Sequence, residues 1–448
     1  MPVPAALPAA RDIGARMDRL PVTRLHGLAM LICALGMLLD TLEMSFGGVL
    51  ATVLSAPPAP VPAGALALLL AAVFVGAVIG APVLGWWADR SGRRTALVAV
   101  LLWIAAASLG AALSHGVATL TLCRFLGGLA LGGYPPIVIA YLTDLLPPQR
   151  RGRLIFGSLS LSLLGPPVAI FLVRWLTPLQ PLGLEGWRWG FALGGVCAAL
   201  AGLLFLALPE SPRWLLARGR SAAAEAGCAS FERSRPLGDL PAAPTRDGLA
   251  KEHAPTAPDA PAGRHWPWVA ALFSLSPWAT VAFPMLTGAV LTQRGFKLDA
   301  ALLIFGLSSL GPLVGNLAAS MILDRIDRRL AMALCALAML ACGSAFIFGS
   351  ATTSLIVAMG LFNLAISLYV TLLTVYGAEL FPTRTRASAT AGAWALNRIG
   401  GALGPLLLVP MLRGAGPATM FAVVAASLVA TLAVLVAAPH GRQRQAVS

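Results

Sequence analysis

Four charged side chains lie inside segments that are otherwise apolar, and their types point to two kinds of chemistry. They are Asp40, Glu43, Arg124 and Arg398. A charge at the centre of a membrane-spanning helix costs about 2.5 to 3.5 kcal/mol on insertion scales, so such residues are usually paired and functional. An arginine offers a planar fork of donors that fits a carboxylate, and a buried carboxyl group can take up and release a proton. The set therefore predicts a site that binds an organic anion and exchanges protons.

Spacing along the helices divides these roles. Asp40 and Glu43 are three residues apart, which places them on one face of a helix, and we expect them to share a water-filled cavity and to carry the proton. At a rise of about 1.5 Å per residue, Arg398 lies near the membrane midplane and Arg124 at about the depth of Asp40. Arg124 would balance the acids, although a static buried pair of Asp40 and Arg124 is an open alternative. The predicted substrate-binding residues are Arg398, Asn397, Arg124, Asn363 and Tyr369.

The elements that must position these residues are long apolar runs. Apolar residues make up 58% of the chain, charged residues make up 11%, and the mean hydropathy is +0.82, which no soluble globular protein matches. The predicted fold is an all-α membrane protein with six helices on each side of a polar insert. Runs of about 20 apolar residues predict twelve transmembrane helices, near 27–50, 63–84, 95–113, 118–142, 153–177, 189–208, 267–291, 299–323, 330–349, 352–377, 387–411 and 415–437.

Two stretches of the chain repeat at one fixed offset. The segment 85–94 recurs at 320–329 and the segment 144–147 at 379–382, so the offset is 235 both times (324 minus 89, 379 minus 144). One offset for two motif pairs indicates two pseudo-symmetric halves, which is typical of secondary transporters. The predicted organisation is an N-terminal segment (1–26), a six-helix bundle (27–208), a linker (209–266), a second six-helix bundle (267–437) and a tail (438–448).

The linker is rich in Ala, Pro, Arg and Gly. It shows no sustained apolar face, and we expect one short helix near 222–231 at most.

The net charge of +14 follows the membrane topology. With the N-terminus inside, 25 of the 32 Lys and Arg residues fall on the inner side, five outside and two within helices. This asymmetry obeys the positive-inside rule, so it predicts cytoplasmic termini and needs no nucleic acid as a partner. Thirty of the 32 are Arg, which together with abundant Ala suggests a GC-rich bacterium and hence a bacterial inner membrane.

Neither an enzyme nor a cofactor site is indicated. The chain has no G-x-x-x-x-G-K-[ST] phosphate loop, so the expected energy source is a proton gradient and not a nucleotide. Five cysteines lie in predicted helices and Cys228 lies in a loop on the reducing side, which argues against a disulfide framework or a metal site. We expect a small organic solute, protons and the lipid bilayer as partners, no cofactor, and a functional monomer.

Charged residues gather at the inner ends of the predicted helices, where water reaches them. Charge pairs there can form and break at modest cost, as a gate over the inner mouth requires. An alternative is that they only fix topology or cap helices. The predicted gate residues are Gly85, Asp89, Arg90, Gly92, Arg93, Arg94, Asp144, Arg151, Arg153, Glu210, Arg213, Asp324, Arg325, Arg328, Arg329, Glu379, Arg384 and Arg386.

These motifs carry a resemblance to a known family. The segment 85–94 fits G-x-x-x-D-[RK]-x-G-[RK]-[RK] at every position, and its copy at 320–329 keeps the Asp and Arg residues but has Ser320 and Asp327 in place of glycines. These two segments resemble a signature of the major facilitator superfamily. Other signatures of that superfamily are resembled by 124–133, Pro209-Glu-Ser-Pro-Arg213 and Glu379-Leu-Phe-Pro-Thr-Arg384. The resemblance covers the whole chain and implies the twelve-helix fold of those transporters.

Within that superfamily the chain is most similar to the aromatic acid:proton symporters, metabolite symporters and sugar porters. Asp40-Thr41-Leu42-Glu43 keeps the spacing and charge of the D-G-x-D motif of aromatic acid symporters, and Arg124 and Asn397-Arg398-Ile399-Gly400 also resemble that group. The resemblance implies a small aromatic carboxylate taken up together with protons.

An organic cation carrier is the main rival. Asp40 and Glu43 could bind a cation in place of protons, beside an aromatic wall of Trp278, Phe283 and Tyr369.

Three other functions fit less well. Sugar or polyol porters line their cavity with Gln, and the predicted helices 153–177 and 267–291 contain none. Drug exporters carry G-x-x-x-G-P, and Leu161 replaces its first Gly. A sensor or a channel fits least, because helices such as 330–349 are almost wholly apolar and give no continuous polar stripe.

Overall fold

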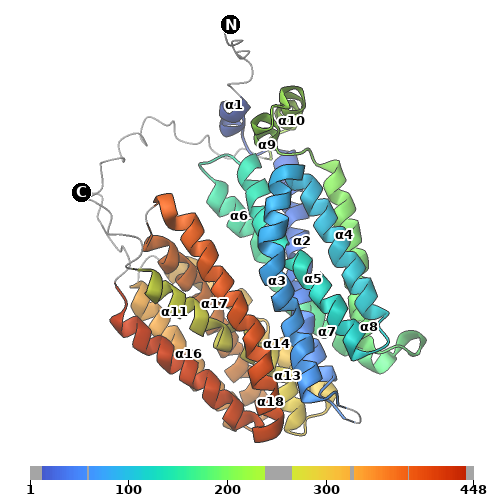
Figure 1. Cartoon of the computed structure of the whole chain (residues 1–448), viewed down its shortest axis with the longest axis vertical. Coiled ribbons are helices and arrows are strands. Elements are labelled where there is room, and N and C mark those ends of the chain that lie inside the picture. The colour runs from blue at the N-terminus through green and yellow to red at the C-terminus, as the bar shows by residue number, and fades with distance from the viewer. Residues whose placement is uncertain (1–12, 58–59, 238–264, 323–326, 382, 440–448) are drawn as a thin grey trace.

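The computed structural model describes residues 13–57, 60–237, 265–322, 327–381 and 383–439. Among these residues there are helices and turns but no β-strand. Two helical bundles, one from each half of the chain, lie side by side (Figure 1).

The first bundle consists of six crossings. The fifth changes to a 3-10 turn just before Pro166 and Pro167, because prolines lack the N–H that the α-helical ladder needs. The crossings are α2 (Arg24–Val53), α3 (Ala63–Ser91), α4 (Arg93–Ala112), α5 (Val117–Leu145), the joined α6 (Arg151–Leu159), η2 (Ser160–Leu164) and α7 (Gly165–Leu179), and α8 (Gly186–Leu204) with η4 (Phe205–Ala207).

The second bundle has more interrupted helices. Its elements are α11 (Trp266–Pro277), η7 (Trp278–Ala282), α12 (Phe283–Met285), α13 (Thr287–Gln293), α14 (Leu298–Ser308), α15 (Gly311–Ile322), α16 (Arg328–Phe348), α17 (Thr352–Glu379) and α18 (Thr383–Ala437). Within the described ranges, eleven helical segments are long and apolar enough to span a membrane, and the last of them is broken at Gly416, where φ is 90°. The break makes two crossings of one, so the predicted twelve-helix fold in two halves is confirmed.

Small residues let α3 and α5 pack backbone to backbone. A Cβ atom added to Gly128 would lie 2.8 Å from Cα of Val73, and one added to Gly80 would lie 2.7 Å from Cα of Leu129. Side chains larger than hydrogen would push the two helices apart, as in other close helix pairs of membrane proteins. This pair forms the wall of the first bundle that faces α18.

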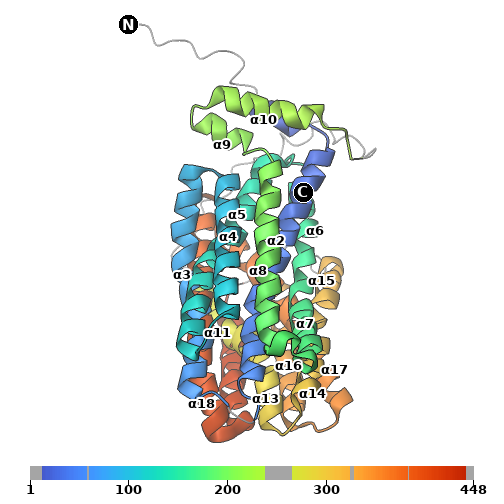
Figure 2. The same cartoon turned by 90° about the vertical axis from the view of Figure 1, so that its right-hand side faces the viewer.

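Three short helices form a layer across one end of the first bundle (Figure 2). They are α1 (Ile13–Arg19), α9 (Pro212–Ala217) and α10 (Ser221–Arg233). We call this layer the collar, this end of the molecule the terminal face, and the other end the opposite face. Because successive crossings alternate in direction, the start of α16 and the ends of α17 and α18 also lie at the terminal face.

The structure of the collar confirms one expectation about the linker and corrects another. The helix expected near 222–231 is confirmed as α10, but the expectation that the linker lacks an apolar face is wrong. Ala224, Gly227, Cys228 and Phe231 are all buried, and their spacing forms one helical stripe. The stripe is too short to stand out in the sequence, since its packing partners come from α1, whose Ile13 and Met17 are also buried.

Ion pairs also join α1 to the linker. Arg16 Nη1 lies 2.7 Å from Oε1 of Glu225, and its Nη2 lies 2.8 Å from Oε2 of Glu232. Arg213 Nη2 on α9 donates to Oδ1 of Asp18 at 2.7 Å. Residues 13–23 of the N-terminal segment and 209–237 of the linker therefore pack together on the first bundle.

Candidate functional site

Glu43 and Arg124 form a buried ion pair inside the first bundle. Glu43 Oε1 accepts from Oγ of Ser108 at 2.5 Å, and its Oε2 lies 3.5 Å from Nη1 of Arg124. Arg124 Nη1 also donates to the Glu43 carbonyl at 3.1 Å, and its guanidinium lies 5.4 Å from the ring centroid of Phe191. Relative exposures of 2% for Glu43 and 4% for Arg124 keep both charges away from solvent. Arg124 thus pairs with Glu43, and not with Asp40 as the open alternative supposed.

Asp40 interacts with a different partner. It is buried, its Oδ1 has no hydrogen-bond partner among the described residues, and it interacts electrostatically with Arg398 of α18. The hydroxyl of Tyr134 on α5 is likewise buried without a partner in the described part of the chain, and it interacts electrostatically with Asp40. Asp40 and Glu43 are one helical turn apart but have separate surroundings: Glu43 lies within the first bundle, and Asp40 interacts with a residue of the second.

Arg398 joins the two halves. Its Nη1 donates to the carbonyl of Ala77 on α3 at 3.0 Å and to the carbonyl of Gly132 on α5 at 3.2 Å. The close packing of α3 and α5 brings these two carbonyls near each other. The Nε and Nη2 groups of Arg398 form no hydrogen bond with the described residues, so two donors of the fork remain available beside Asp40.

The predicted amide and hydroxyl ligands lie in the second bundle. Asn397 Nδ2 donates to Oγ of Ser276 at 2.8 Å, and Asn363 Nδ2 donates to the carbonyl of Ser308 at 3.0 Å. These bonds join α18 to α11 and α17 to α14. Tyr369 is 1% exposed in the same interior. In the described structure no hydrogen bond connects these three side chains to Arg398, so their present contacts are those of helix packing.

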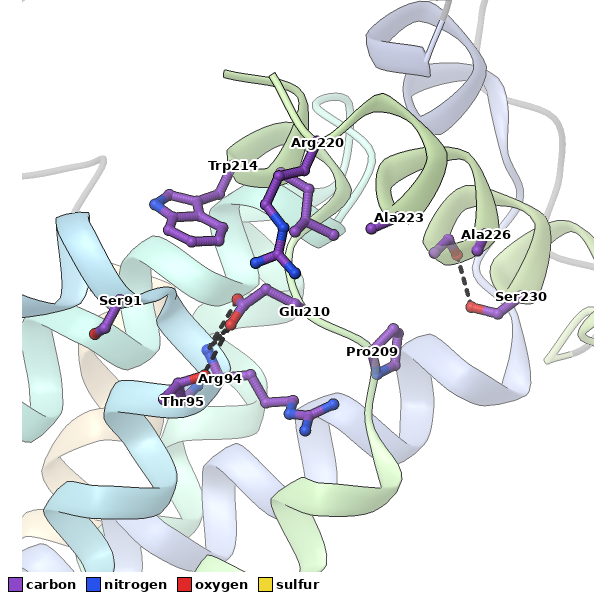
Figure 3. Close-up of a pocket in the computed structure, with 12 residues that line it drawn as sticks. Ser91, Arg94, Thr95, Pro209, Glu210, Trp214, Arg220, Ala223, Ala226 and Ser230 are labelled. Atoms are coloured by element: carbon purple, nitrogen blue, oxygen red, sulfur yellow. Dashed lines mark hydrogen bonds between the residues drawn. The ribbon is translucent and has the colours of Figure 1, made fainter. Parts of the chain in front are cut away.

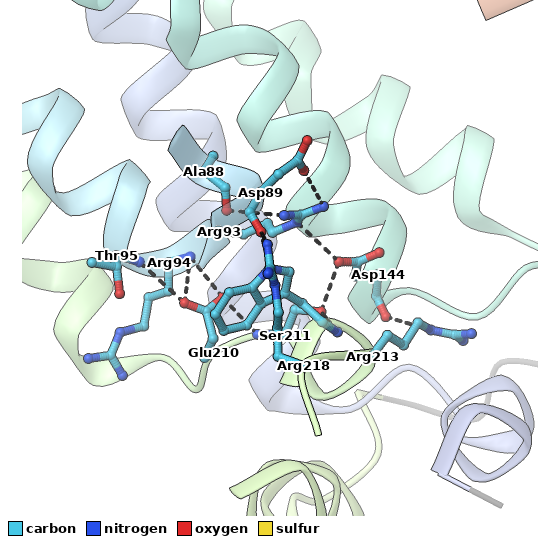
Figure 4. Close-up of polar contacts among 11 residues, drawn as sticks. Ala88, Asp89, Arg93, Arg94, Thr95, Asp144, Glu210, Ser211, Arg213 and Arg218 are labelled. Atoms are coloured by element: carbon cyan, nitrogen blue, oxygen red, sulfur yellow. Dashed lines mark hydrogen bonds and ion pairs between the residues drawn. The ribbon is translucent and has the colours of Figure 1, made fainter. Parts of the chain in front are cut away.

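The predicted gate residues of the first half form a continuous network at the terminal face (Figure 4). Arg93 Nη2 lies 2.8 Å from Oδ1 of Asp89, and its Nε lies 3.7 Å from Oδ2 of Asp144. Asp144 Oδ2 also accepts from Oγ of Ser211 in the linker at 2.8 Å. The network therefore links the ends of α3 and α5, the start of α4 and the linker.

Glu210 caps the start of α4. Its carboxylate accepts from the backbone N–H groups of Arg94 at 3.0 Å, Thr95 at 3.4 Å and Ser211 at 2.9 Å. Gly92 precedes the helix with φ of 108°, a region that L-residues with a side chain rarely adopt. A Cβ atom at Gly92 would also lie 2.9 Å from the carboxyl carbon of Glu210. Both the turn and the cap thus require glycine at this position.

Most other predicted gate arginines of the first half bind carbonyls at helix ends. Arg94 Nη1 donates to Leu208 O at 2.9 Å, Arg213 Nε to Asp144 O at 2.9 Å, and Arg151 to Leu146 O at 3.2 Å. Such contacts offset the negative end of a helix.

Three residues of the predicted gate set stand apart. The guanidinium of Arg90 lies over the Trp86 ring at 3.7 Å, Arg153 is exposed, and Gly85 borders open space.

The second half repeats this arrangement in part. Arg328 Nε lies 3.5 Å from Oε1 of Glu379, as Arg93 lies near Asp144, and Arg329 Nε donates to Leu435 O at 2.9 Å, as Arg94 does to Leu208. Asp324 and Arg325 lie outside the described residues, and so do the side chains of Arg384 and Arg386.

Comparison with known proteins decides the family. The sequence profile of the Major Facilitator Superfamily matches residues 29–405. The chain belongs to this superfamily. Proteins of the superfamily that resemble it include the niacin transporter NiaP of Acinetobacter baylyi, 26% identical over 419 residues that cover 90% of each chain. A gallate transporter of Pseudomonas putida is 27% identical over 444 residues, which cover 97% of this chain and 96% of that protein.

A solved structure of the superfamily shows the same fold. The crystal structure of a D-xylose-proton symporter superposes with a TM-score of 0.72 at 19% identity, covering 94% of this chain and 99% of that chain. The chain is therefore a multi-pass membrane protein of the major facilitator fold, a secondary transporter of small metabolites, and not an enzyme.

Sequence reasoning about this superfamily member missed two groups of residues. The first anchors the collar: Trp214 Nε1 and Arg218 Nη2 donate to the carbonyl of Asp89 at 2.8 and 2.5 Å. The second is Arg413 on the opposite face, whose Nη1 donates to Val61 O at 2.5 Å and whose Nη2 donates to Oγ of Ser55 at 3.2 Å. No spacing rule identifies them, because each arginine binds backbone or hydroxyl groups far away in the sequence.

Proposed function

We propose that this transporter takes up a small organic carboxylate together with protons, across a bacterial inner membrane with both termini in the cytoplasm. One observation supports this most strongly. Arg398 reaches from the second half to the first, keeps two donors without partners among the described residues, and interacts electrostatically with the buried Asp40. An anion site and a proton-carrying group are therefore neighbours at the boundary between the halves.

The donors of Arg398 favour a carboxylate as the substrate group. Nε and Nη2 lie on one edge of the guanidinium and can bind both oxygens of a carboxylate. Niacin and gallate, which the two relatives are named for, are both aromatic carboxylates. We therefore favour a small aromatic carboxylate, in line with the motif resemblance at Asp40-Thr41-Leu42-Glu43.

Competition for Arg398 explains why proton and substrate would bind together. A carboxylate on Arg398 and an ionised Asp40 would repel each other, and a proton on Asp40 removes that repulsion. Binding of the anion then favours binding of the proton, and the reverse holds by linkage. Glu43 already has Arg124 and Ser108 as partners and is the second proton candidate.

Contacts between the halves suggest which face is closed in this structure. On the opposite face Arg413 binds the segment that joins α2 to α3, and Arg174 Nη2 lies 3.0 Å from Oδ2 of Asp299. At the terminal face the charged network from Asp89 to Glu210 stays within the first half and the linker. We propose that alternating access breaks the Arg413 contacts as it closes the terminal face, and that the chain works as a monomer.

Thermal stabilisation of the purified protein tests the proposal. Nicotinate, gallate, choline and xylose are compared as ligands, since a compound that binds the folded state raises its melting temperature. We expect a shift with a carboxylate that disappears in Arg398→Ala but persists in the control Arg174→Gln, which removes a surface arginine between the same halves.

The competing carriers predict different shifts. An organic cation carrier requires stabilisation by choline alone, abolished by Asp40→Asn, but the positive charge of Arg398 near Asp40 disfavours a cation there. Stabilisation by xylose alone would favour a sugar porter. Either result would contradict the carboxylate proposal.

A further inference from the structure

A cavity of about 450 Å³ lies at the terminal face, between the start of α4 and the collar (Figure 3). Trp214, Ala223 and Ala226 form its collar side, and Ser91 and Thr95 lie on the side of α3 and α4. The cavity is separate from the boundary site at Asp40 and Arg398. Its lining combines a small apolar surface with hydroxyl groups and charged side chains.

Arg220 gives the cavity a cation whose guanidinium has no partner in the described part of the chain. No hydrogen bond or ion pair joins its side chain to any described residue, whereas the side chains of Arg16, Arg213 and Arg218 of the collar all have acidic or carbonyl partners. Its guanidinium points toward Glu210, from the collar side of the cavity (Figure 3). An arginine held over a cavity with five open donors is a ready group for an anion.

The other two charged residues of the lining are Glu210 and Arg94, so the lining as a whole carries a net positive charge. Glu210 receives hydrogen bonds from the backbone of Arg94, Thr95 and Ser211, and it lies at the positive end of α4, so its charge is offset locally. The guanidinium of Arg94 uses Nη1 for the carbonyl of Leu208, and its other donors have no acceptor among the described residues. Arg94 on α4 and Arg220 on the collar therefore both line the cavity.

We propose that this cavity binds the phosphate group of a small phosphorylated solute. A phosphate monoester carries close to two negative charges at neutral pH, which matches Arg94 and Arg220, and its oxygens suit bidentate guanidinium contacts. The cavity volume exceeds that of a phosphate group, and Trp214 and Ala223 leave an apolar surface for the organic part. The ligand would bridge the collar and the start of α4, next to the gate residue Arg93.

Equilibrium dialysis with glycerol 3-phosphate tests the site on the purified full chain in lipid-free detergent and phosphate-free buffer. We expect saturable binding of one ligand per chain and a loss of affinity of about tenfold or more in Arg220→Gln. Arg233→Gln is the matched control, because Arg233 ends the helix that Arg220 precedes and its Nε donates only to Ala229 O of that helix. Ala223→Leu reduces the cavity without changing charge and should also weaken binding.

Three results would overturn the proposal. The first is the absence of saturable binding at millimolar ligand, and the second is equal affinity in Arg220→Gln and Arg233→Gln. The third concerns a lipid headgroup as the source of the phosphate. If phosphatidylglycerol in nanodiscs binds in an Arg220-dependent way and glycerol 3-phosphate does not compete, the ligand is a lipid and not a solute.

Discussion

The two halves start their third crossing with the same backbone groups and different acids. In the first half Glu210 accepts from the N–H groups of Arg94 and Thr95, and in the second half Asp327 accepts from those of Arg329 and Leu330. The amides correspond at the repeat offset (329 minus 94 and 330 minus 95 are both 235). The cap is kept, but the residue that supplies it changes.

Backbone conformation explains the change. Asp327 occupies the position of Gly92 (327 minus 92 is 235) and has φ of −56°, where a side chain is tolerated, whereas Gly92 has φ of 108°. The first half therefore takes its cap from the linker, which ties the collar to the predicted gate residues. The second half supplies its own cap and needs no collar. Asp327, in the second copy of the motif, thus replaces Glu210 as the acid that caps the helix.

The interiors differ as well. Arg124 on α5 corresponds to Met359 on α17 (359 minus 124 is 235), and both are buried. The repeat keeps charge at the terminal face but not in the core. The two interior acids, Asp40 and Glu43, lie in the first half, and this supports its proposed role in binding protons, whereas the second half contributes Arg398.

The largest effect is expected from replacing Arg124 with methionine, the residue that the second half has at the corresponding position. Arg124→Met leaves the Glu43 carboxylate buried without a cation, which should lower the unfolding free energy by about 3 to 5 kcal/mol. Met359→Leu, the matched change in the second half, should cost less than about 1.5 kcal/mol. Unfolding in a dodecyl sulfate titration measures both. Adding Glu43→Gln should recover part of the loss, and an Arg124→Met protein as stable as the Met359→Leu protein would contradict the pairing.

The next largest effect is expected from removing the two helix caps, because the two halves should lose different amounts of stability. Glu210→Ala deprives three amides of their acceptor and loosens the collar, so we expect a loss of about 2 kcal/mol, against about 1 kcal/mol for Asp327→Ala. Hydrogen exchange reports where the loss occurs. It should increase at Arg94 and Thr95 and in α10 for the first variant, and only at Arg329 and Leu330 for the second. Protection of α10 that is unchanged by Glu210→Ala would show that the collar is not tied to the gate in this way.

Exchanging the residues at the turn tests the conformational explanation. Gly92→Asp should not rescue Glu210→Ala, because a side chain at φ of 108° costs about 1 to 2 kcal/mol and offsets any local cap. Melting temperatures of the single and double variants give the answer. A double variant more stable than Glu210→Ala alone would mean that the turn adapts and that φ does not decide which acid caps the helix.

The smallest effect concerns the pH dependence of the collar. Hydrogen bonds from Arg16 hold the pKa of Glu232 below its usual range. A carboxylate with a lower pKa in the folded state adds stability above its unfolded pKa of about 4.3, and this stability is lost as pH falls through the folded value. Hydrogen exchange of α1 should therefore increase below about pH 4.3, modestly because the pair is partly exposed. In Arg16→Gln this pH dependence should be absent, and its persistence would assign it to another group.

Apolar runs and the repeat were sufficient to predict the fold and to predict that charged residues such as Arg93, Asp144, Arg328 and Glu379 gather at the inner helix ends, but not which of them pair. Run length reports membrane crossings directly, and the offset of 235 aligns helix ends. Rise along a helix gives depth but not the direction in which a side chain points, so it placed Arg124 level with Asp40 and could not identify Glu43 as the partner. The collar was missed because the apolar stripe of α10 needs α1, more than 200 residues away, to cover it.

Uptake by proteoliposomes under an imposed pH gradient is the most direct test of coupled binding at Asp40 and Arg398. The carboxylate that stabilises the protein is supplied outside vesicles with an alkaline interior. The account predicts accumulation above the external concentration for the unaltered protein, and only downhill equilibration in Asp40→Asn. Accumulation that survives in Asp40→Asn, or that does not respond to the pH gradient in the unaltered protein, would contradict it.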